Sequence, residues 1–268
     1  MKSFKKVLAI ALAAATVFAF GACGSQDTTT AEGDSDTAYV QDKGTLVVGI
    51  TEFEPMDYKD EDGNWIGFDA DMAAAFAESL GVDVEFTVID WDNKIMELEA
   101  KSIDCVWNGM TLTDEVTSAM ECSNPYCDNA QVVVLPADIA DKYQDIDSLA
   151  DLNFAAEAGS AGEAELNANG LNVTSVSTQA DALMEVAAGT SDACAIDLLM
   201  ASAMTGEGTS YENLVYTVKL NSEQYGAGFR KGSDLAQALN DFLAASYADG
   251  TMQEIADKYG IAGSLMEQ

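Results

Sequence analysis

Short apolar runs alternate with segments of helical periodicity along most of the chain, and this alternation limits the fold more than any other feature. Residues 45–50 and 82–88 are apolar runs typical of strands. Between them, apolar residues recur at helical spacing from Phe68 to Leu80, and Gly81 follows as a C-terminal stop. Strands that alternate with helices form parallel βαβ units, so we expect an α/β fold.

The pattern starts again in the second half of the chain. A strand is expected at residues 154–156, and residues 189–194 (GTSDAC) echo residues 101–105 (KSIDC). This weak internal repeat supports two α/β lobes. Ligands bind beyond the carboxyl ends of the strands in open α/β sheets, so two facing lobes predict a cleft between them.

The first residues have the three-part layout of a secretory signal. Lysines at positions 2, 5 and 6 precede an uncharged apolar run at residues 7–20, and small residues then lead to Cys23. The run is shorter than the ~20 residues that a membrane-spanning helix needs. We therefore predict a signal peptide at residues 1–22 and a flexible spacer, rich in Ser, Thr, Asp and Gly, at residues 23–44.

Residues 20–23 (FGAC) resemble the bacterial lipobox, in which the cysteine is lipidated and becomes the new N-terminus. This resemblance predicts a lipid on Cys23. It also predicts an exported protein that is anchored on the outer face of the cell membrane, or a periplasmic one. The alternative is an ordinary signal peptide with an incidental cysteine.

The composition excludes several classes of function. A formal charge of −34 repels nucleic-acid phosphates, so no nucleic-acid partner is expected. The absence of histidine excludes Ser-His-Asp and Cys-His catalysis and removes the commonest zinc ligand. We expect neither a metal nor another cofactor. Arg230 is the single arginine of the sequence, so few bidentate carboxylate contacts are available.

Four cysteines follow Cys23 in the sequence. Cys122 and Cys127 are close enough in sequence to form a disulfide, and the alternative is a pair of free thiols. Cys105 and Cys194 lie in apolar, strand-like runs, so they are expected to be buried as small hydrophobic residues.

Five short motifs occur along the chain in one order. They are residues 67–72 (GFDADM), 104–111 (DCVWNGMT), 123–126 (SNPY), 158–163 (AGSAGE), and 224–226 (QYG) with 229–232 (FRKG). Together they resemble extracellular solute-binding protein family 3, the polar amino-acid-binding lipoproteins of bacterial ABC importers. The resemblance implies two Rossmann-like lobes joined by a two-strand hinge, the type II periplasmic-binding-protein fold. It places lobe 1 at residues 45–130 and 222–268, and lobe 2 at residues 131–221.

The resemblance also implies a ligand site between the lobes. Asp197 is suited to bind an ammonium group, although an Asp at this position can also cap the helix that follows. Gly159, Ser160 and Ala161 open a helix whose N–H groups attract a carboxylate, unless they form only a glycine turn. The other implied ligand-binding residues are Phe53, Glu54, Trp91, Asn108, Gly109, Met110 and Thr111. Gly109 and Thr111 would face the ligand carboxylate, and Trp91 packs either on the ligand or in the core.

One position departs from the family pattern. The family arginine that grips the ligand carboxylate corresponds to Val116 here. Lys94 is the candidate replacement, and an ordinary solvated lysine is the alternative. Glu52, Glu54 and Glu157 lie near predicted pocket loops, which disfavours anionic ligands and favours a zwitterion or a cation.

We therefore expect a monomeric substrate-binding lipoprotein of an ABC importer. It would capture a small polar amino acid, zwitterionic or cationic, in the interlobe cleft and deliver it to a membrane permease. No enzymatic activity is expected. One alternative is an enzyme on the same fold, similar to a cyclic amino-acid dehydratase, with Glu54 or Glu157 as the acid. Another alternative is a ligand-sensing ectodomain.

Overall fold

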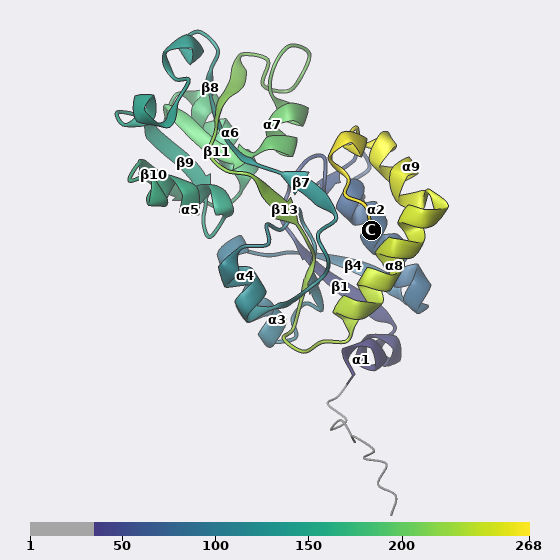
Figure 1. Ribbon diagram of the computed structural model, residues 1–268. Coiled ribbons are helices and arrows are strands. Elements are labelled where there is room, and N and C mark those ends of the chain that lie inside the picture. The colour runs from purple at the N-terminus through teal and green to yellow at the C-terminus, as the bar shows by residue number, and fades with distance from the viewer. Residues whose placement is uncertain (1–34) are drawn as a thin grey trace, which may run out of the picture. The chain divides into compact units, whose positions relative to one another are not determined.

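The computed structural model describes residues 35–268, which Figure 1 draws as a coloured ribbon. The predicted signal peptide at residues 1–22, the lipid on Cys23 and the spacer up to residue 34 lie outside the described residues. Within the described part of the chain, no helix has both the length and the apolar character that crossing a bilayer requires.

The first of two large sheets has the strand order β4-β1-β5-β14-β6. Its strands are β1 (Thr45–Ile50), β4 (Asp83–Val88), β5 (Cys105–Val106), β6 (Glu121–Cys122) and β14 (Gly228–Phe229). β1 pairs in parallel with β4 and β5, whereas β14 runs antiparallel to β5 and β6. The helices that accompany this sheet are α1 (Asp36–Lys43), α2 (Phe68–Leu80), α3 (Lys94–Glu99), α4 (Asp114–Ala119), α8 (Leu235–Asp249) and α9 (Thr251–Lys258). We call this group lobe 1; it also contains the short hairpin of β2 (Tyr58–Lys59) and β3 (Trp65–Ile66).

The second large sheet has the strand order β10-β9-β11-β8-β12. Its strands are β8 (Gln131–Pro136), β9 (Asn153–Glu157), β10 (Asn172–Val176), β11 (Ala193–Asp197) and β12 (Leu214–Lys219). β9 pairs in parallel with β10 and β11, and β8 is antiparallel to β11 and β12. Helices α5 (Ala161–Ala168), α6 (Gln179–Ala188) and α7 (Leu198–Met204) pack on this sheet, and we call this group lobe 2.

Two short strands connect the lobes. β7 (Cys127–Asn129) leads from lobe 1 into lobe 2, and β13 (Glu223–Tyr225) leads back. They pair antiparallel to each other and run between the two groups of elements in Figure 1. Two α/β lobes joined by two crossing strands confirm the predicted fold class. The predicted boundaries of the lobes, at residues 131 and 222, stay a prediction.

Local sequence signals determine where several helices begin and end. The Thr113 side chain caps α4 by accepting from Val116 N, and the Thr178 side chain caps α6 by accepting from Asp181 N. α2 ends at Gly81, which has the positive φ of 76° that glycine adopts without strain. The stop at Gly81 was expected from the sequence.

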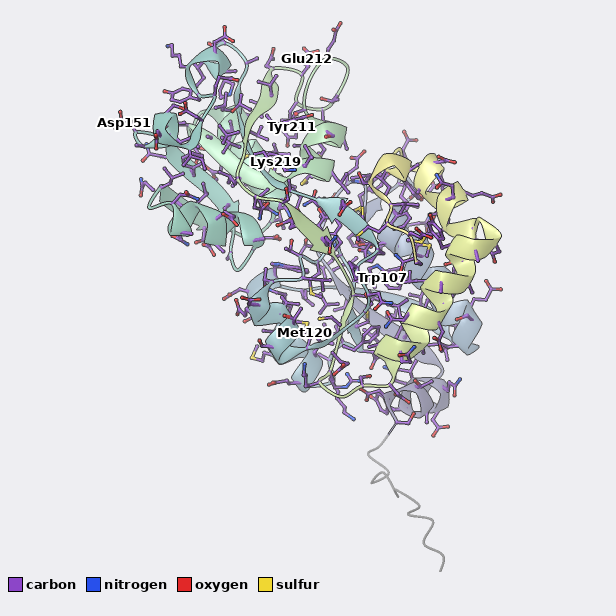
Figure 2. The ribbon with its side chains drawn as sticks, viewed as in Figure 1. Trp107, Met120, Asp151, Tyr211, Glu212 and Lys219 are labelled. Atoms are coloured by element: carbon purple, nitrogen blue, oxygen red, sulfur yellow. The ribbon has the colours of Figure 1, made fainter. Side chains whose placement is uncertain are left out.

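The core of lobe 1 contains Trp107, which is fully buried; Figure 2 shows it inside that lobe. It packs among aromatic side chains that include Phe76 and Tyr126. The four cysteines of the described chain are free thiols, so Cys122 and Cys127 form no disulfide here. Cys105 and Cys194 are buried, which confirms their assignment to the core.

Helix α1 corrects the predicted flexible spacer over residues 36–43. Ser35 caps this helix by accepting from Ala38 N, and Gly44 ends it with a φ of 78°. Val40 is fully buried against lobe 1. Polar contacts also dock this helix, since Ser35 and Thr37 N donate to Asp234 and Arg230 pairs with Asp36. The polar composition of the segment concealed these signals.

Candidate ligand-binding site

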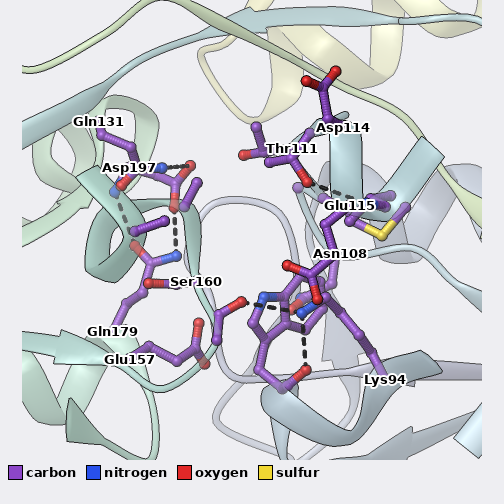
Figure 3. A pocket seen from close by; sticks show the side chains of 18 residues that line it. Lys94, Asn108, Thr111, Asp114, Glu115, Gln131, Glu157, Ser160, Gln179 and Asp197 are labelled. Atoms are coloured by element: carbon purple, nitrogen blue, oxygen red, sulfur yellow. Dashed lines mark hydrogen bonds between the residues drawn. The ribbon is translucent and has the colours of Figure 1, made fainter. Parts of the chain in front are cut away.

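A cavity of about 220 Å³ lies between the lobes and is lined by residues of both. At the ~30 Å³ that a water molecule occupies in the liquid, it has room for a ligand of amino-acid size. Figure 3 shows the labelled side chains in two groups that face each other. Gln131, Glu157, Ser160, Gln179 and Asp197 come from lobe 2. Lys94, Asn108, Thr111, Asp114 and Glu115 come from lobe 1.

Asp197 ends β11 and is 3% exposed. Its Oδ1 accepts from Asn129 Nδ2 at 2.5 Å, Tyr225 Oη at 2.6 Å and Gln131 Nε2 at 3.0 Å. The side-chain amide of Gln179 donates to its Oδ2. Asp197 occupies the N-cap position of α7, as the alternative expected, but its side chain makes no capping hydrogen bond to that helix.

Burial first, and then the nearby Glu223 carboxylate, raise the pKa of Asp197 from 3.8 to about 8. Hydrogen bonds from Tyr225, Gln179 and Gln131 oppose this shift because they stabilise the charged form. Asp197 is therefore an acid that is costly to ionise while the cavity holds no counter-charge. A cation in the cavity would favour its ionised form.

Glu157 ends β9 and lines the same side of the cavity, with 2% of its surface exposed. Its Oε1 is buried and has no hydrogen-bond partner among the described residues. Burial first, and then the Asp197 carboxylate, raise the pKa of Glu157 to about 8, while Lys94 acts in the opposite direction. A buried, unpartnered carboxyl oxygen in a ligand-sized cavity is an open acceptor for a ligand N–H group.

The predicted carboxylate seat lies at the start of α5. Ser160 caps the helix by accepting from Glu163 N at 3.1 Å. Gly159 N donates to Glu163 Oε2 at 2.8 Å, so an acid of the protein already lies at this helix end. Gly159, Ser160 and Ala161 all line the cavity. Gly159 also has a φ of 70°, and a Cβ there would lie 2.8 Å from Asp92 Oδ1 of lobe 1.

Lys94 reaches from lobe 1 to lobe 2. Its Nζ donates to the backbone oxygens of Trp91 at 3.2 Å and Gly159 at 3.0 Å, and it lies 4.9 Å from the centre of the Trp91 ring. Lys94 is 7% exposed, so the solvated-lysine alternative is wrong. Burial lowers the pKa of this ammonium group. Trp91 combines both of its expected positions, since it lines the cavity and belongs to an apolar cluster.

Asn108, Gly109, Met110 and Thr111 line the lobe 1 side of the cavity. The Asn108 side chain is held by Thr51, accepting from Thr51 N and Oγ1 at 2.9 Å each and donating to Thr51 O at 3.0 Å. The Asn108 amide is therefore engaged in hydrogen bonds within lobe 1, although the residue borders the cavity.

The two groups expected to face a ligand carboxylate from lobe 1 are engaged with acids of the protein. Gly109 N donates to Asp69 Oδ2 at 2.6 Å. Thr111 Oγ1 donates to Glu223 Oε1 at 2.9 Å. The structure therefore places both residues at the cavity while directing these donors elsewhere.

Phe53 and Glu54 do not line the cavity, contrary to the prediction. Phe53 is 1% exposed and meets Tyr225 edge to face, with ring centroids 6.3 Å apart. Its ring also fills the space beside Gly109, where a Cβ would lie 2.5 Å from Phe53 Cε1. Phe53 thus shapes the wall of the cavity from behind, as a core residue.

The sequence profile of the bacterial extracellular solute-binding proteins, family 3, matches residues 46–262 of this chain. The chain belongs to this family. The type II periplasmic-binding-protein fold expected from the sequence is confirmed together with it.

Named relatives of this family 3 protein bind amino acids. The L-cystine-binding protein TcyJ of Escherichia coli (strain K12) is 28% identical over 225 residues, which cover 82% of this chain and 84% of the relative. The arginine-binding extracellular protein ArtP of Bacillus subtilis (strain 168) is 27% identical over 265 residues, covering 95% and 98%. A solved structure, the ancestral amino acid-binding protein AncCDT-1, a precursor of cyclohexadienyl dehydratase, superposes with a TM-score of 0.77 at 30% identity and covers 84% of this chain and 99% of that chain.

Several residues of the family 3 site were not predicted from the sequence. Gln131 and Gln179 hold Asp197, and Asp114 and Glu115 add acids from the first turn of α4. A glutamine at the start of a strand or helix has no distinctive pattern, so no signal could have found the first two. Val116 lines the cavity as an apolar residue. Within residues 35–268, no group of three His, Cys, Asp or Glu side chains is placed to hold a metal ion.

Proposed function

We propose that this family 3 protein is the substrate-binding component of an ABC importer and captures a small amino acid, zwitterionic or cationic, between its lobes. The observation that carries the proposal is the buried Asp197 carboxylate, held by four side-chain donors at the edge of a ligand-sized cavity. Such a carboxylate complements a ligand ammonium group. The amino acids bound by the named relatives support the same class of ligand.

The proposed ligand contacts are the sequence-predicted residues that line the cavity. They are Trp91, Lys94, Asn108, Gly109, Met110, Thr111, Gly159, Ser160, Ala161 and Asp197. Closure of both lobes over the ligand would exclude water and strengthen these polar contacts. The closed, loaded protein would then dock on a membrane permease.

A binding screen tests this proposal. A panel of amino acids is added to the purified mature protein, thermal unfolding is followed, and hits are titrated calorimetrically. A true ligand at ~100 times its dissociation constant stabilises the protein by ~2.7 kcal/mol. Asp197→Asn should weaken binding by about 100-fold or more, because a charge pair is lost, whereas Asp151→Asn on the exposed surface of lobe 2 should leave it unchanged. Tight binding of aspartate or glutamate, or no binding across the panel, would refute the proposal.

We also propose that Cys23 carries a lipid that anchors the exported protein on the outer face of the cell membrane. The charged start, apolar run and lipobox-like residues 20–23 support this. Cells that express the full chain are grown with radioactive palmitate. The wild-type band should be labelled and the Cys23→Ser band should not, and equal labelling of both would contradict lipidation.

A second candidate function is an enzyme on the same fold. Two observations favour it: the similarity to AncCDT-1, and the pKa of about 8 at Glu157, which leaves a protonated acid in the cavity at neutral pH. Incubation with cyclic amino acids that bear a hydroxyl leaving group, followed by mass spectrometry, distinguishes the two functions. We expect binding without turnover. A product lacking one water, formed by the wild type and not by Glu157→Gln, would favour the enzyme.

A further inference from the structure

Acidic side chains outnumber basic ones around the cavity. Asp114, Glu115, Glu157 and Asp197 line it, and Lys94 is the one cation among its described lining residues. The single arginine serves elsewhere, since Arg230 pairs with Asp36 at 3.0 Å in lobe 1. A cation that enters would favour the ionised forms of Glu157 and Asp197 and could then pair with them.

The ammonium group of Lys94 is already occupied. Two of its three N–H donors bind the backbone oxygens of Trp91 and Gly159, and its charge lies over the Trp91 ring. The carboxylates of Glu115 and Glu157 lie nearby and favour the charged form of the lysine. A ligand carboxylate would have to compete with both acids for the one remaining donor.

Several other donors around the cavity serve carboxylates of the protein. Gly109 N binds Asp69, and Thr111 Oγ1 binds Glu223. The side-chain amide of Gln131 is shared between Asp197 and Glu223, at 3.0 and 2.8 Å. At the start of α5, Gly159 N donates to Glu163 of the same helix. A ligand carboxylate would have to compete with these acids for the engaged donors, and the donors that remain, such as Ala161 N, carry no full charge.

Acceptors, in contrast, are in surplus. Glu157 Oε1 is buried without a partner, and Asp197 Oδ2 receives the Gln179 amide alone among the described side chains. A carboxylate oxygen can accept two hydrogen bonds. Both oxygens belong to lobe 2, at the ends of β9 and β11, where Figure 3 shows the two side chains on one side of the cavity.

We propose that the site recognises the positive group of its ligand and makes no ion pair with a ligand carboxylate, so that the decarboxylated amine of a bound amino acid binds at least as tightly as the amino acid itself. This inference rests on the proposed function and narrows its ligand class to organic cations of amino-acid size. The positive group lies against Glu157 and Asp197.

Matched pairs of ligands test the inference by calorimetry: arginine with agmatine, lysine with cadaverine, and histidine with histamine. In any pair that binds, we expect the dissociation constant of the amine to be equal to or lower than that of the amino acid, within about threefold. An amino acid that binds more than threefold tighter than its amine overturns the inference but leaves the proposed function intact. If no member of any pair binds, the inference is overturned, whereas the proposed function is overturned only if the whole amino-acid panel fails to bind.

Two variants locate the charges that matter. Glu157→Gln should weaken amine binding at least tenfold, whereas Glu85→Gln on the exposed edge of lobe 1 should have no effect. Undiminished amine binding by Glu157→Gln overturns the inference.

For Lys94→Met the readout is the ratio of the two dissociation constants in each pair. A general weakening of the site affects both constants alike and leaves this ratio unchanged. If Lys94 gripped a ligand carboxylate, its removal would weaken binding of the amino acid alone. We expect the ratio of the two dissociation constants in each pair to stay unchanged, even where loss of the contact with Gly159 weakens both. A ratio that shifts tenfold toward the amine overturns the inference.

Discussion

Replacement of Glu157 by Gln is expected to make the ligand-free protein more stable at neutral pH. Burial, followed by the charge of Asp197, raises the pKa of Glu157 from 4.5 to about 8 in the folded protein. Between these values the folded protein holds the proton and the unfolded chain does not. The free energy of unfolding therefore falls as pH rises, by ~1.4 kcal/mol per pH unit for this one group.

The magnitude follows from the width of that window. Below about pH 4.5 the carboxyl group is mostly protonated in both states, so the variant and the wild type should be nearly equally stable there. At about pH 7.5, roughly three pH units higher, the free energy of unfolding of the wild type has fallen by about 4 kcal/mol through this group. The variant shows no such fall, because glutamine does not titrate. Asp197 still makes the free energy of unfolding of the variant fall with pH, because its pKa is also raised to about 8.

Urea unfolding of the wild type, Glu157→Gln and the exposed control Glu85→Gln, at several pH values between about 5 and 8, measures this difference. The difference in free energy of unfolding between the wild type and Glu157→Gln should increase steadily with pH, while the control should have the same free energy of unfolding as the wild type. Parallel curves for wild type and Glu157→Gln would refute the reasoning, because they would mean that Glu157 titrates normally in the folded protein.

Three further predictions concern other residues. Gly159→Ala should weaken ligand binding at least tenfold by calorimetry, because the new Cβ would lie 2.9 Å from the Asp92 Cα across the cleft and φ at this position is 70°; unchanged affinity would contradict the close approach. Val40→Ala should lower the free energy of unfolding by about 2 kcal/mol in urea, because this fully buried side chain docks α1, and no loss would mean that α1 is not docked in solution. Tyr225→Phe removes a donor that lowers the pKa of Asp197, so the pH at which cation affinity rises should move upward in a pH series of titrations; an unmoved midpoint would exclude this bond as a determinant.

The sequence predicted the fold well because its signals are local. The helical periodicity from Phe68 and the stop at Gly81 depend on residues a few positions apart, so periodicity and turn chemistry reveal them. Helix α1 was missed for a related reason. Its one deeply buried apolar residue, Val40, gives no periodic pattern, and its stability comes from contact with lobe 1.

The site was predicted in part. Asp197, Ser160 and Lys94 reach the cavity as expected. Phe53 does not, because Tyr225, far along the chain, and Gly109 draw its ring into the core. Contacts between distant segments leave no mark in the local sequence. The same limit applies to hydrogen bonding, since nothing in the neighbourhood of Gly109 reveals that its N–H is directed toward Asp69.

The two ends of lobe 2 touch where the crossing strands meet it. Gln131 N donates to Asn221 Oδ1 at 2.7 Å, and Leu220 N donates to Gln131 O at 2.8 Å. Lobe 2 is thus one uninterrupted stretch of chain whose two ends are joined by hydrogen bonds. It carries Glu157, Gln179 and Asp197. The whole stretch can therefore be grafted as one segment into a related receptor. The graft would transfer Glu157, Gln179 and Asp197, and with them the ligand preference, while the recipient keeps its own lobe 1.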